Sequence, residues 1–371
     1  MSGAVGVSAC GSDDGGGSTE AATATTAGSS VVAAARKTVE ALSGPDGTYT
    51  SPPTSGPKAT PGKNVWVIGF GNLSPASVAL EKEWKGSLAP ALDWNVKYVD
   101  GKSDPNAWLE GIRNAVNAHA DGIVTQFVDC ASVKSGLLAA KKARIPVISI
   151  NGADCDDTPL FTAVTTSNYG SLDEANAAYG KIQADWVIAD SDGKADVVAM
   201  ENVETSGTKL WTKAWQDAMA KCEGCSTDSV TWSFADLGPK LQQKTQQALL
   251  KNPKADYVFA QVDDAITAGI ASGVQAAGRK AKIVGFDCDP NVLKLMKAGK
   301  VAACFTATPT WPAYSAADGL VRAFAGEQPA KDSGRGLMLV TPDVNFPSDL
   351  SKYPEPAIDF RKIYQATWGV G

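Results

Sequence analysis

Short apolar runs alternate with amphipathic stretches along the chain from Asn64 onward, and this alternation constrains the fold more than any other feature. In the first half, the apolar runs predict strands over residues 65–70, 95–99, 122–127 and 145–150. The stretches between and after them predict helices over residues 74–88, 104–118 and 132–143. Because the strands are almost continuously apolar, both of their faces must be covered, which is typical of parallel sheets flanked by helices. The sequence therefore predicts an α/β protein.

The same alternation restarts after a break near Thr165–Gly170. Helices are expected over residues 171–189, 209–221, 239–252 and 265–277, and strands over residues 195–201, 229–233, 257–261, 282–287 and 301–305. Two doubly wound, Rossmann-like lobes of similar size explain this repetition. Ligands of such sheets bind outside the carboxyl ends of the strands. Two lobes that face each other would place those ends across a shared cleft.

Charge and composition exclude several classes of function. The net charge of −6 argues against a nucleic-acid binder, which needs an excess of basic side chains. The single histidine, His119, disfavours Ser-His-Asp catalysis, zinc sites and histidine general bases. No apolar run reaches the roughly 20 residues of a membrane-spanning helix. We therefore expect a protein that is not an enzyme, with no cofactor and no metal ion.

Residues 1–62 are poor in bulky apolar side chains and rich in Gly, Ser, Thr and Ala, which predicts a flexible linker with a turn or two of helix within residues 30–41. Within it, the stretch Val7–Gly11 resembles a bacterial lipobox, whose cysteine, here Cys10, becomes the lipid-modified N-terminus. The basic and apolar regions of a full signal peptide do not precede Cys10. We expect an exported domain, tethered to the outer face of the cell membrane through a lipid anchor.

Six further cysteines follow Cys10: Cys130, Cys155, Cys222, Cys225, Cys288 and Cys304. An even number in an exported protein indicates disulfides, although sequence alone allows fifteen connectivities. If the strands before Cys130 and Cys155 are parallel neighbours, both cysteines lie at one sheet edge and can pair. The same argument makes Cys288 and Cys304 plausible partners. The Cys222–Cys225 motif follows a helix instead of beginning one, which favours a structural disulfide over a redox-active pair.

At this point the chain resembles the type I periplasmic substrate-binding proteins, in particular the ribose- and galactose-binding group, whose fold also forms the core of LacI-type repressors. The residues that carry the resemblance are spread over nearly all of residues 64–330. They are Asp121–Val124, Phe127–Asp129, Ile145–Asn151, Ser167–Tyr169, Val258–Asp264 and Ile283–Asp287. A repressor is disfavoured because no basic helix-turn-helix segment precedes Asn64.

The resemblance implies a type I fold, in which a hinge of three crossing strands lets the two lobes close over a small ligand. The crossings would fall near Ser167–Asn168, Thr306–Pro309 and Leu339–Pro342. After the linker, the N-terminal lobe would comprise residues 63–166 plus 308–338. The C-terminal lobe would comprise residues 167–307 plus 339–371. Ligand contacts with both lobes would shift the equilibrium between open and closed forms.

The family's contact motifs also imply a set of ligand-binding residues. Sugars present hydroxyl groups and apolar C–H faces, so their sites combine aromatic rings with Asp, Asn and Gln side chains. The matching positions are Phe70, Asn72, Ser74, Gln126, Asp129, Asn151, Trp211, Asp263, Phe286 and Asp287. Trp211 and Trp311 both stand where they could line the cleft. The chain departs from the family's pattern at Trp211, Asn151–Gly152, Val262 and Ala307, where the family often has Arg, Asp-Arg, Asn and Gln. These departures suggest a ligand other than ribose.

The resulting expectation is a monomeric solute-binding protein that captures a small polar ligand, which we expect to be a sugar, for the permease of an ABC importer. A ligand-sensing receptor of the same fold, which signals to a membrane kinase or chemoreceptor, and a binder of a non-sugar molecule remain the alternatives. A dinucleotide loop over residues 69–74 is disfavoured because Ser74 and Pro75 suit a helix start. We expect Asp263–Asp264 and Asp287–Asp289 to bind ligand or cap turns rather than hold a cation.

Overall fold

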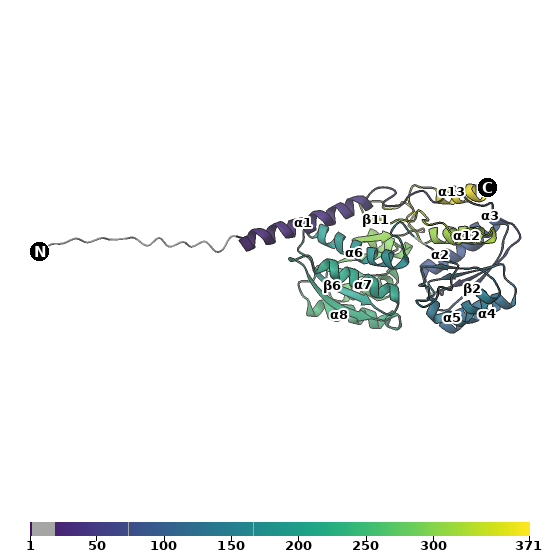
Figure 1. Ribbon diagram of the computed structural model, residues 1–371. Helices are drawn as coiled ribbons and strands as arrows, with labels where there is room; N and C mark the ends of the chain where they lie inside the picture. Colours follow the sequence, from purple (N-terminus) through teal and green to yellow (C-terminus); the bar gives the residue numbers. More distant parts are fainter. Residues whose placement is uncertain (2–18, 73, 166) are drawn as a thin grey trace.

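The computed structural model describes Met1 and residues 19–72, 74–165 and 167–371, which fold into two α/β lobes (Figure 1). The N-terminal lobe contains a five-stranded sheet of order β2-β1-β3-β4-β5, and the C-terminal lobe contains a six-stranded sheet of order β11-β10-β9-β8-β6-β7. The strand pairs are parallel except for the antiparallel pair β10–β11. The α/β class and the two doubly wound lobes predicted from the sequence are confirmed.

Alternate residues of the first sheet pack on opposite helical layers. Its strands are β1 (Asn64–Gly69), β2 (Asn95–Asp100), β3 (Gly122–Gln126), β4 (Val147–Ile150) and β5 (Ala163–Val164). Its helices are α2 (Pro75–Glu83), which continues through η1 (Trp84–Leu88) into α3 (Ala89–Leu92), then α4 (Pro105–Asn117), α5 (Cys130–Lys142) and α12 (Trp311–Phe324). Val65 and Val67 join the core beneath α2 and α12, whereas Trp66 and Ile68 join the core beneath α4 and α5. Both faces of the sheet are therefore covered.

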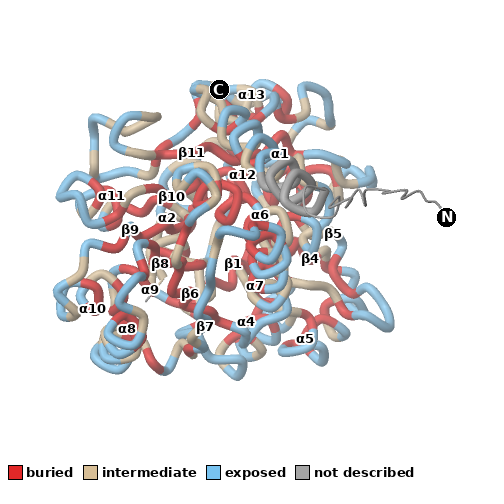
Figure 2. Tube along the Cα trace, turned by 90° about the vertical axis from the view of Figure 1, so that its left-hand side faces the viewer, coloured by how far each residue is buried: buried red, intermediate tan, exposed pale blue. Residues whose placement is uncertain are grey.

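The second sheet is covered in the same way, and Figure 2 shows its central strands as buried segments beneath exposed helices. Its strands are β6 (Asp196–Asn202), β7 (Ser226–Trp232), β8 (Tyr257–Ala260), β9 (Lys282–Phe286), β10 (Ala303–Thr306) and β11 (Met338–Val340). One face carries α6 (Leu172–Asp190) and α7 (Ser206–Met219). The other face carries η2 (Phe234–Asp236), α8 (Pro239–Lys251), α9 (Asp263–Ala265), η3 (Ile266–Ile270), α10 (Ala271–Ala276) and α11 (Pro290–Lys297). The parallel strands of this sheet all end at the edge that faces the N-terminal lobe.

The expected flexible linker is wrong over residues 19–42, which form the long helix α1 (Thr19–Leu42) where only a turn or two of helix within residues 30–41 was expected. Ala35 and Leu42 are buried in the core of the C-terminal lobe, and Val31, Val32 and Val39 pack against that core. The helix lies along α6. The segment is rich in alanine, which has the highest helix propensity, so it forms a helix although few of its side chains are strongly hydrophobic. Its small side chains allow it to pack closely against α6. Cys10 and the lipobox lie outside the described residues.

Residues 43–53, which we call the hinge strap, form the expected loop but are held firmly in place. The backbone N–H of Thr48 donates to the carbonyl of Leu337 at 2.8 Å, and that of Thr50 donates to Gly334 at 3.0 Å. The buried Tyr49 hydroxyl donates to Thr308 at 2.8 Å. The strap therefore hydrogen-bonds to two segments that connect the lobes.

Three crossings between the lobes form the hinge, after β5, after β10 and before β11, and the segment between β11 and α13 crosses once more. The first two crossings, at residues 167–171 and 307–310, lie where the family resemblance placed them. The segment 325–337 makes the third, ahead of the expected position, because β11 already belongs to the second sheet. The chain then returns, and helix α13 (Phe360–Trp368) packs on α12 of the N-terminal lobe. We therefore propose the predicted domain boundaries with residues 325–337 as a crossing and α13 assigned to the N-terminal lobe.

Three disulfides join the cysteines after Cys10. Cys130 pairs with Cys155 across 25 residues, as expected from two neighbouring strand ends, with a Cα–Cα distance of 5.2 Å. Cys222 pairs with Cys225, and Cys288 pairs with Cys304. The second of these pairs joins the segments after β9 and within β10, which are parallel neighbours. The expected structural disulfides are thus present in the described part of the chain.

Candidate functional site

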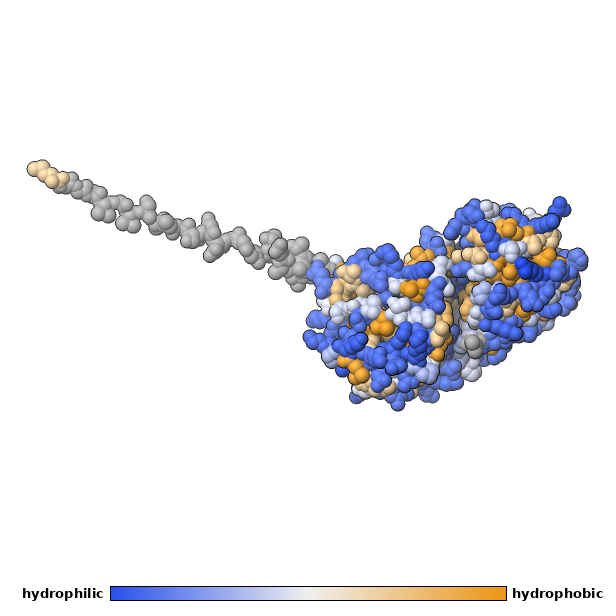
Figure 3. All heavy atoms as spheres, turned by 90° about the horizontal axis from the view of Figure 1, so that it is seen from below, coloured by the Kyte–Doolittle hydropathy of each residue, from blue (hydrophilic) through white to orange (hydrophobic). Residues whose placement is uncertain are grey.

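The carboxyl ends of the two sheets face each other across a cleft, which appears as a hollow between the lobes when the molecule is seen from below (Figure 3). The cleft encloses about 220 Å³. The N-terminal lobe contributes Phe70, Ser74, Ala76, Phe127, Asp129 and Asn151. The C-terminal lobe contributes Leu172, Asn176, Tyr179, Thr205, Ser206, Gly207, Thr208, Trp211, Phe234, Val262, Asp264, Phe286 and Asp287, and the third crossing contributes Arg335. Most of these residues follow a strand or begin a helix, as expected for doubly wound sheets.

Aromatic rings line both walls of the cleft. In the N-terminal lobe, Phe70 meets Phe127 edge-on with ring centroids 6.4 Å apart. In the C-terminal lobe, Trp211, Tyr179 and Phe286 form a cluster with centroid distances of 4.6–5.2 Å. The indole N–H of Trp211 already donates to Gln183 at 2.7 Å, so this side chain offers a ligand its ring alone. Such rings suit the apolar C–H faces of a small polyhydroxylated ligand.

Carboxyl groups gather at the C-terminal wall of the cleft. Burial, together with Asp289, raises the pKa of Asp287 to about 6, while Arg335 opposes this rise. Burial, followed by the charges of Asp287 and Asp289, raises the pKa of Asp264 to about 7. Burial also raises the pKa of Tyr353 above its ordinary value, with Asp287 as the largest charge contribution. Tyr353, in the segment after β11, therefore lies near these carboxyl groups.

Arg335 is the basic side chain of the cleft, and it lies where the crossings meet. Its Nε atom donates to the carbonyl of Ala307 at 3.1 Å, and its Nη1 atom donates to Oδ1 of Asn151 at 2.9 Å. Its own backbone carbonyl accepts a hydrogen bond from the N–H of Asn168 at 2.8 Å. Arg335 thus connects all three crossings and orients the amide of Asn151 after β4.

A hydrogen bond joins the lobes at the mouth of the cleft. The Ser206 hydroxyl, in the first turn of α7, donates to Oδ2 of Asp129 at 3.3 Å. The other carboxylate oxygen of Asp129 accepts from the backbone N–H of Ala153 at 2.9 Å. Asp129 is therefore held by its own lobe while it contacts the opposite one.

The structure brings together most of the ligand-binding residues expected from the sequence. Those that line the cleft are Phe70, Ser74, Asp129, Asn151, Trp211, Phe286 and Asp287. A ligand role for them stays a prediction. Trp311, which was also expected to be able to line the cleft, is fully buried, donates to the carbonyl of Ser333 at 2.9 Å and stacks on Phe360.

Three expected ligand-binding residues lie elsewhere. Gln126 is fully buried, and its Oε1 accepts from the Tyr98 hydroxyl at 2.8 Å. Asp263 points into the lobe, where its Oδ2 accepts the backbone N–H of Asp289 at 2.6 Å, and the next residue, Asp264, lines the cleft instead. Asn72 lines a different cavity. A turn at the end of a strand changes which side chain faces the cleft, and sequence alone does not show that change.

Of the residues that line the cleft, Tyr179 and Arg335 were not expected from the sequence, and Asp264 was expected only as a member of an acidic pair. Tyr179 lies inside α6, where its helical spacing is that of an ordinary core residue. Asp264 belongs to the expected acidic pair Asp263–Asp264, of which the set of expected ligand-binding residues included Asp263. Arg335 stands between two glycines at a crossing, and an isolated cation in such a segment was the signal that could have identified it.

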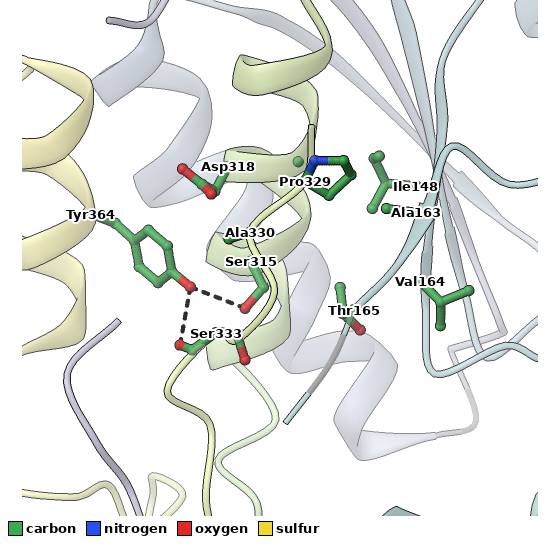
Figure 4. Close-up of a pocket in the computed structure, with 11 residues that line it drawn as sticks. Ile148, Ala163, Val164, Thr165, Ser315, Asp318, Pro329, Ala330, Ser333 and Tyr364 are labelled. Atoms are coloured by element: carbon green, nitrogen blue, oxygen red, sulfur yellow. Dashed lines mark hydrogen bonds between the residues drawn. The ribbon is translucent and has the colours of Figure 1, made fainter. Parts of the chain in front are cut away.

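Two of the other cavities in the described part of the chain contain hydrogen-bonded or ion-paired polar side chains. One lies within the N-terminal lobe between β4, β5 and α12, where the Tyr364 hydroxyl is hydrogen-bonded to Ser315 and to the carbonyl of Ser333 (Figure 4). The other lies between α2, the start of α11 and residues 351–355, and Arg361 in it is paired with Glu83 and Glu355. Their polar groups bond one another, which indicates structural roles. In the described part of the chain, no group of three or more His, Cys, Asp or Glu side chains could hold a metal ion.

Residues 86–328 match the model of the family described as periplasmic binding protein domain, which is well over half of the chain. The chain belongs to this family. Among proteins of known name, it is 25% identical over 238 residues to the ribose import binding protein RbsB of Salmonella typhimurium, an alignment that covers 64% of this chain and 76% of the relative. It is 23% identical over 229 residues to the RbsB protein of Haemophilus influenzae, covering 62% of this chain and 74% of that protein.

Solved structures support the fold of this periplasmic binding protein domain. GanP, a glucose-galactose binding protein from Geobacillus stearothermophilus, matches with a TM-score of 0.65 and 19% identity over 76% of this chain and 98% of that one. A periplasmic ribose ABC transporter protein from Conexibacter woesei matches with a TM-score of 0.65 and 20% identity over 78% and 95%. The family resemblance inferred from the sequence is confirmed.

Proposed function

We propose that the protein is an extracytoplasmic solute-binding protein that captures a sugar in the interlobe cleft and delivers it to the permease of an ABC importer. The observation that carries this proposal is the pairing of aromatic rings on both walls with carboxyl, amide and guanidinium groups between them. Sugar hydroxyls both donate and accept hydrogen bonds, and the C–H faces of sugars stack on aromatic rings. The relatives named for ribose and galactose binding support the same class of ligand.

Capture follows from the arrangement of the lobes around three crossings. A ligand held by Phe70 and Asn151 on one side and by Trp211 and Asp287 on the other contacts both lobes only when they are close together. Differential contact of this kind shifts the equilibrium toward the closed form. The closed form then presents a surface made of both lobes to the permease.

We further propose that Cys10 carries a lipid anchor and that the protein acts as a monomer. No helix in the described part of the chain is long and apolar enough to span a membrane. Growth of producing cells with a labelled fatty acid tests the anchor: label should enter the wild-type protein, and Cys10→Ala should abolish incorporation. Label that persists in Cys10→Ala would contradict lipidation at this cysteine.

A thermal-shift screen of the full chain tests the ligand class. A ligand that binds only the folded protein stabilises it by RT ln(1 + [L]/Kd), where [L] is the free ligand concentration, and so raises the melting temperature. We expect a rise of several degrees with one of the sugars ribose, galactose, glucose or arabinose, and no rise with amino acids or nucleosides. The Trp211→Ala variant should lose this rise. A rise with nucleosides or amino acids alone would contradict the sugar proposal.

A further inference from the structure

Arg335 lies in the third crossing and bonds two other segments of the chain next to the hinge. Its backbone belongs to the third crossing, its Nε bonds the second crossing at Ala307, and its Nη1 bonds Asn151 of the N-terminal lobe. Ala307 has a small apolar side chain and is buried, and its backbone carbonyl is the group that accepts from Arg335. The polar group beside the second crossing is therefore the guanidinium of Arg335, which comes from the third crossing.

Much of the hydrogen-bonding capacity of Arg335 is left for a ligand. A guanidinium carries five N–H donors, and two of them bond to Ala307 and Asn151. Within the described residues, its Nη2 atom has no partner, although only 5% of the residue is exposed and it lines the cleft. Because Arg335 lines the cleft, an oxygen-bearing ligand at the hinge end can accept a charge-assisted hydrogen bond from this atom.

The charge of the cleft restricts which ligand can do this. Asp129, Asp264 and Asp287 line the cleft, and among the described lining residues Arg335 is the one basic side chain. A carboxylate on the ligand would gain from Arg335 but would face three carboxyl groups. A neutral hydroxyl has no such conflict, because it accepts from the guanidinium and donates to a carboxylate such as Asp287.

We propose that Arg335 is the specificity-determining residue of the cleft: it donates to oxygen atoms of a neutral sugar at the hinge end, and the surrounding carboxyl groups reject sugar acids. This inference rests on the proposed function, and it adds the charge class of the ligand and the residue that reads it. Because Arg335 belongs to the third crossing and its side chain bonds the second crossing and Asn151, contact with the sugar also fixes the hinge in one arrangement.

Isothermal titration calorimetry on the full chain tests the proposal, with D-ribose, D-galactose, D-ribonate and D-galacturonate as probes. The wild type should bind at least one neutral sugar, and its acid at least about 100-fold more weakly. Arg335→Met should weaken binding of the neutral sugar by about 10- to 100-fold, the range expected for hydrogen bonds to a charged group. Arg335→Lys, which retains charge but not the planar fork, should give an intermediate loss.

Arg322→Met is the matched control. Arg322 is also a largely buried arginine, but it pairs with Asp318 within α12 and donates to the carbonyl of Ser55, outside the cleft. This variant should lower the melting temperature while the affinity for the sugar stays within about twofold. It separates loss of stability from loss of a ligand contact. Circular dichroism spectra of each variant show whether it is folded, and Arg335→Lys remains informative if Arg335→Met is not.

Each other outcome has a distinct meaning. If folded Arg335→Met, or Arg335→Lys where Arg335→Met is unfolded, binds the neutral sugar within about twofold of the wild type, the role of Arg335 is overturned and the sugar-binding function stands. If the acid binds as tightly as its neutral sugar, the proposed charge class is overturned. If the wild type binds neither neutral sugar in the titration nor any sugar in the thermal-shift screen, the proposed function fails and this inference fails with it.

Discussion

Ser206 and Asp129 lie on opposite lobes, 77 residues apart in the chain, and the Ser206 hydroxyl donates to the Asp129 carboxylate at 3.3 Å. This hydrogen bond crosses the mouth of the cleft at an exposed position, where water competes for both groups. Its net contribution is therefore small, about 0.5–1.5 kcal/mol. A contribution of this size shifts the balance between open and closed lobes without locking either form.

Removal of this hydrogen bond should favour the open form. We expect Ser206→Ala to increase the dissociation rate of the bound sugar by about 2- to 10-fold, the range that corresponds to the free energy above. Stopped-flow tryptophan fluorescence would measure this rate. Ser135→Ala is the control, because the Ser135 hydroxyl accepts from Arg113 at 3.3 Å within a single lobe. An equal change in both variants would show that the interlobe contact has no special role.

The ring of Trp211 should matter more for binding than its N–H group does. Because the indole N–H is already bonded to Gln183, Trp211→Phe retains an aromatic face for the ligand and loses an internal hydrogen bond. We expect Trp211→Ala to weaken sugar binding by more than about 1 kcal/mol and Trp211→Phe by clearly less. Calorimetric titration of both variants checks this. Equal losses would indicate that the indole itself is required.

The stability of the ligand-free protein should fall as the pH rises from 4 to 8. The pKa values of Asp287 and Asp264 are raised to about 6 and about 7, above the unfolded value of 3.8. A raised carboxyl pKa means that the folded state binds more protons than the unfolded state in this window. The stabilisation is fully present below pH 4 and is lost as the pH passes through these values.

Melting temperatures across this pH range test the prediction. Asp264→Asn removes one titrating group while keeping its shape, so it should flatten the pH dependence and stabilise the protein at pH 8. Exposed Asp217, which pairs with Lys213 on α7, provides the control variant Asp217→Asn. A wild-type melting temperature that rises steadily from pH 5 to pH 8 would contradict the raised pKa values.

The disulfides should differ in their effect on stability. Cys130–Cys155 closes a loop of 25 residues, so its loss should destabilise the protein by about 3–4 kcal/mol on the chain-entropy account. Cys222–Cys225 closes a loop of only 3 residues and should contribute about half as much. Denaturant unfolding of the two double Cys→Ser variants measures both values. A larger loss for the short loop would contradict this account.

The hinge strap should be part of the folded unit. Tyr49 is buried beside Trp311, with ring centroids 5.1 Å apart, and its hydroxyl bonds Thr308 and the carbonyl of Thr306. Tyr49→Phe should lower the free energy of unfolding by about 1–2 kcal/mol, because the buried hydrogen bond to Thr308 is lost. Thermal unfolding checks this, with Tyr353→Phe as a comparison that removes a hydroxyl from the segment after β11.

Local pattern predicted the elements because burial in a layered α/β fold is periodic. Residues 65–68 were predicted as a strand because all four are apolar. In the structure all four are buried, and alternate residues pack against the helices on opposite faces of the sheet. Cys130 and Cys155 could be paired for the same reason, as both follow strands that end at one edge. The length of helix α1 was not predicted, because an alanine-rich segment shows little difference in hydrophobicity between its two faces. Its packing against α6 is what identifies the buried face.

The sequence by itself determined the α/β class and the two lobes, because these depend on the order and periodicity of neighbouring residues, and its motifs indicated the family. Only the tertiary structure decided which side chains enter the cleft. Asp264 faces the cleft and Asp263 does not, because a turn sets their directions. Arg335 meets Asn151 from 184 residues away through the third crossing. Such contacts arise from the packing of distant segments, and local sequence carries no record of them.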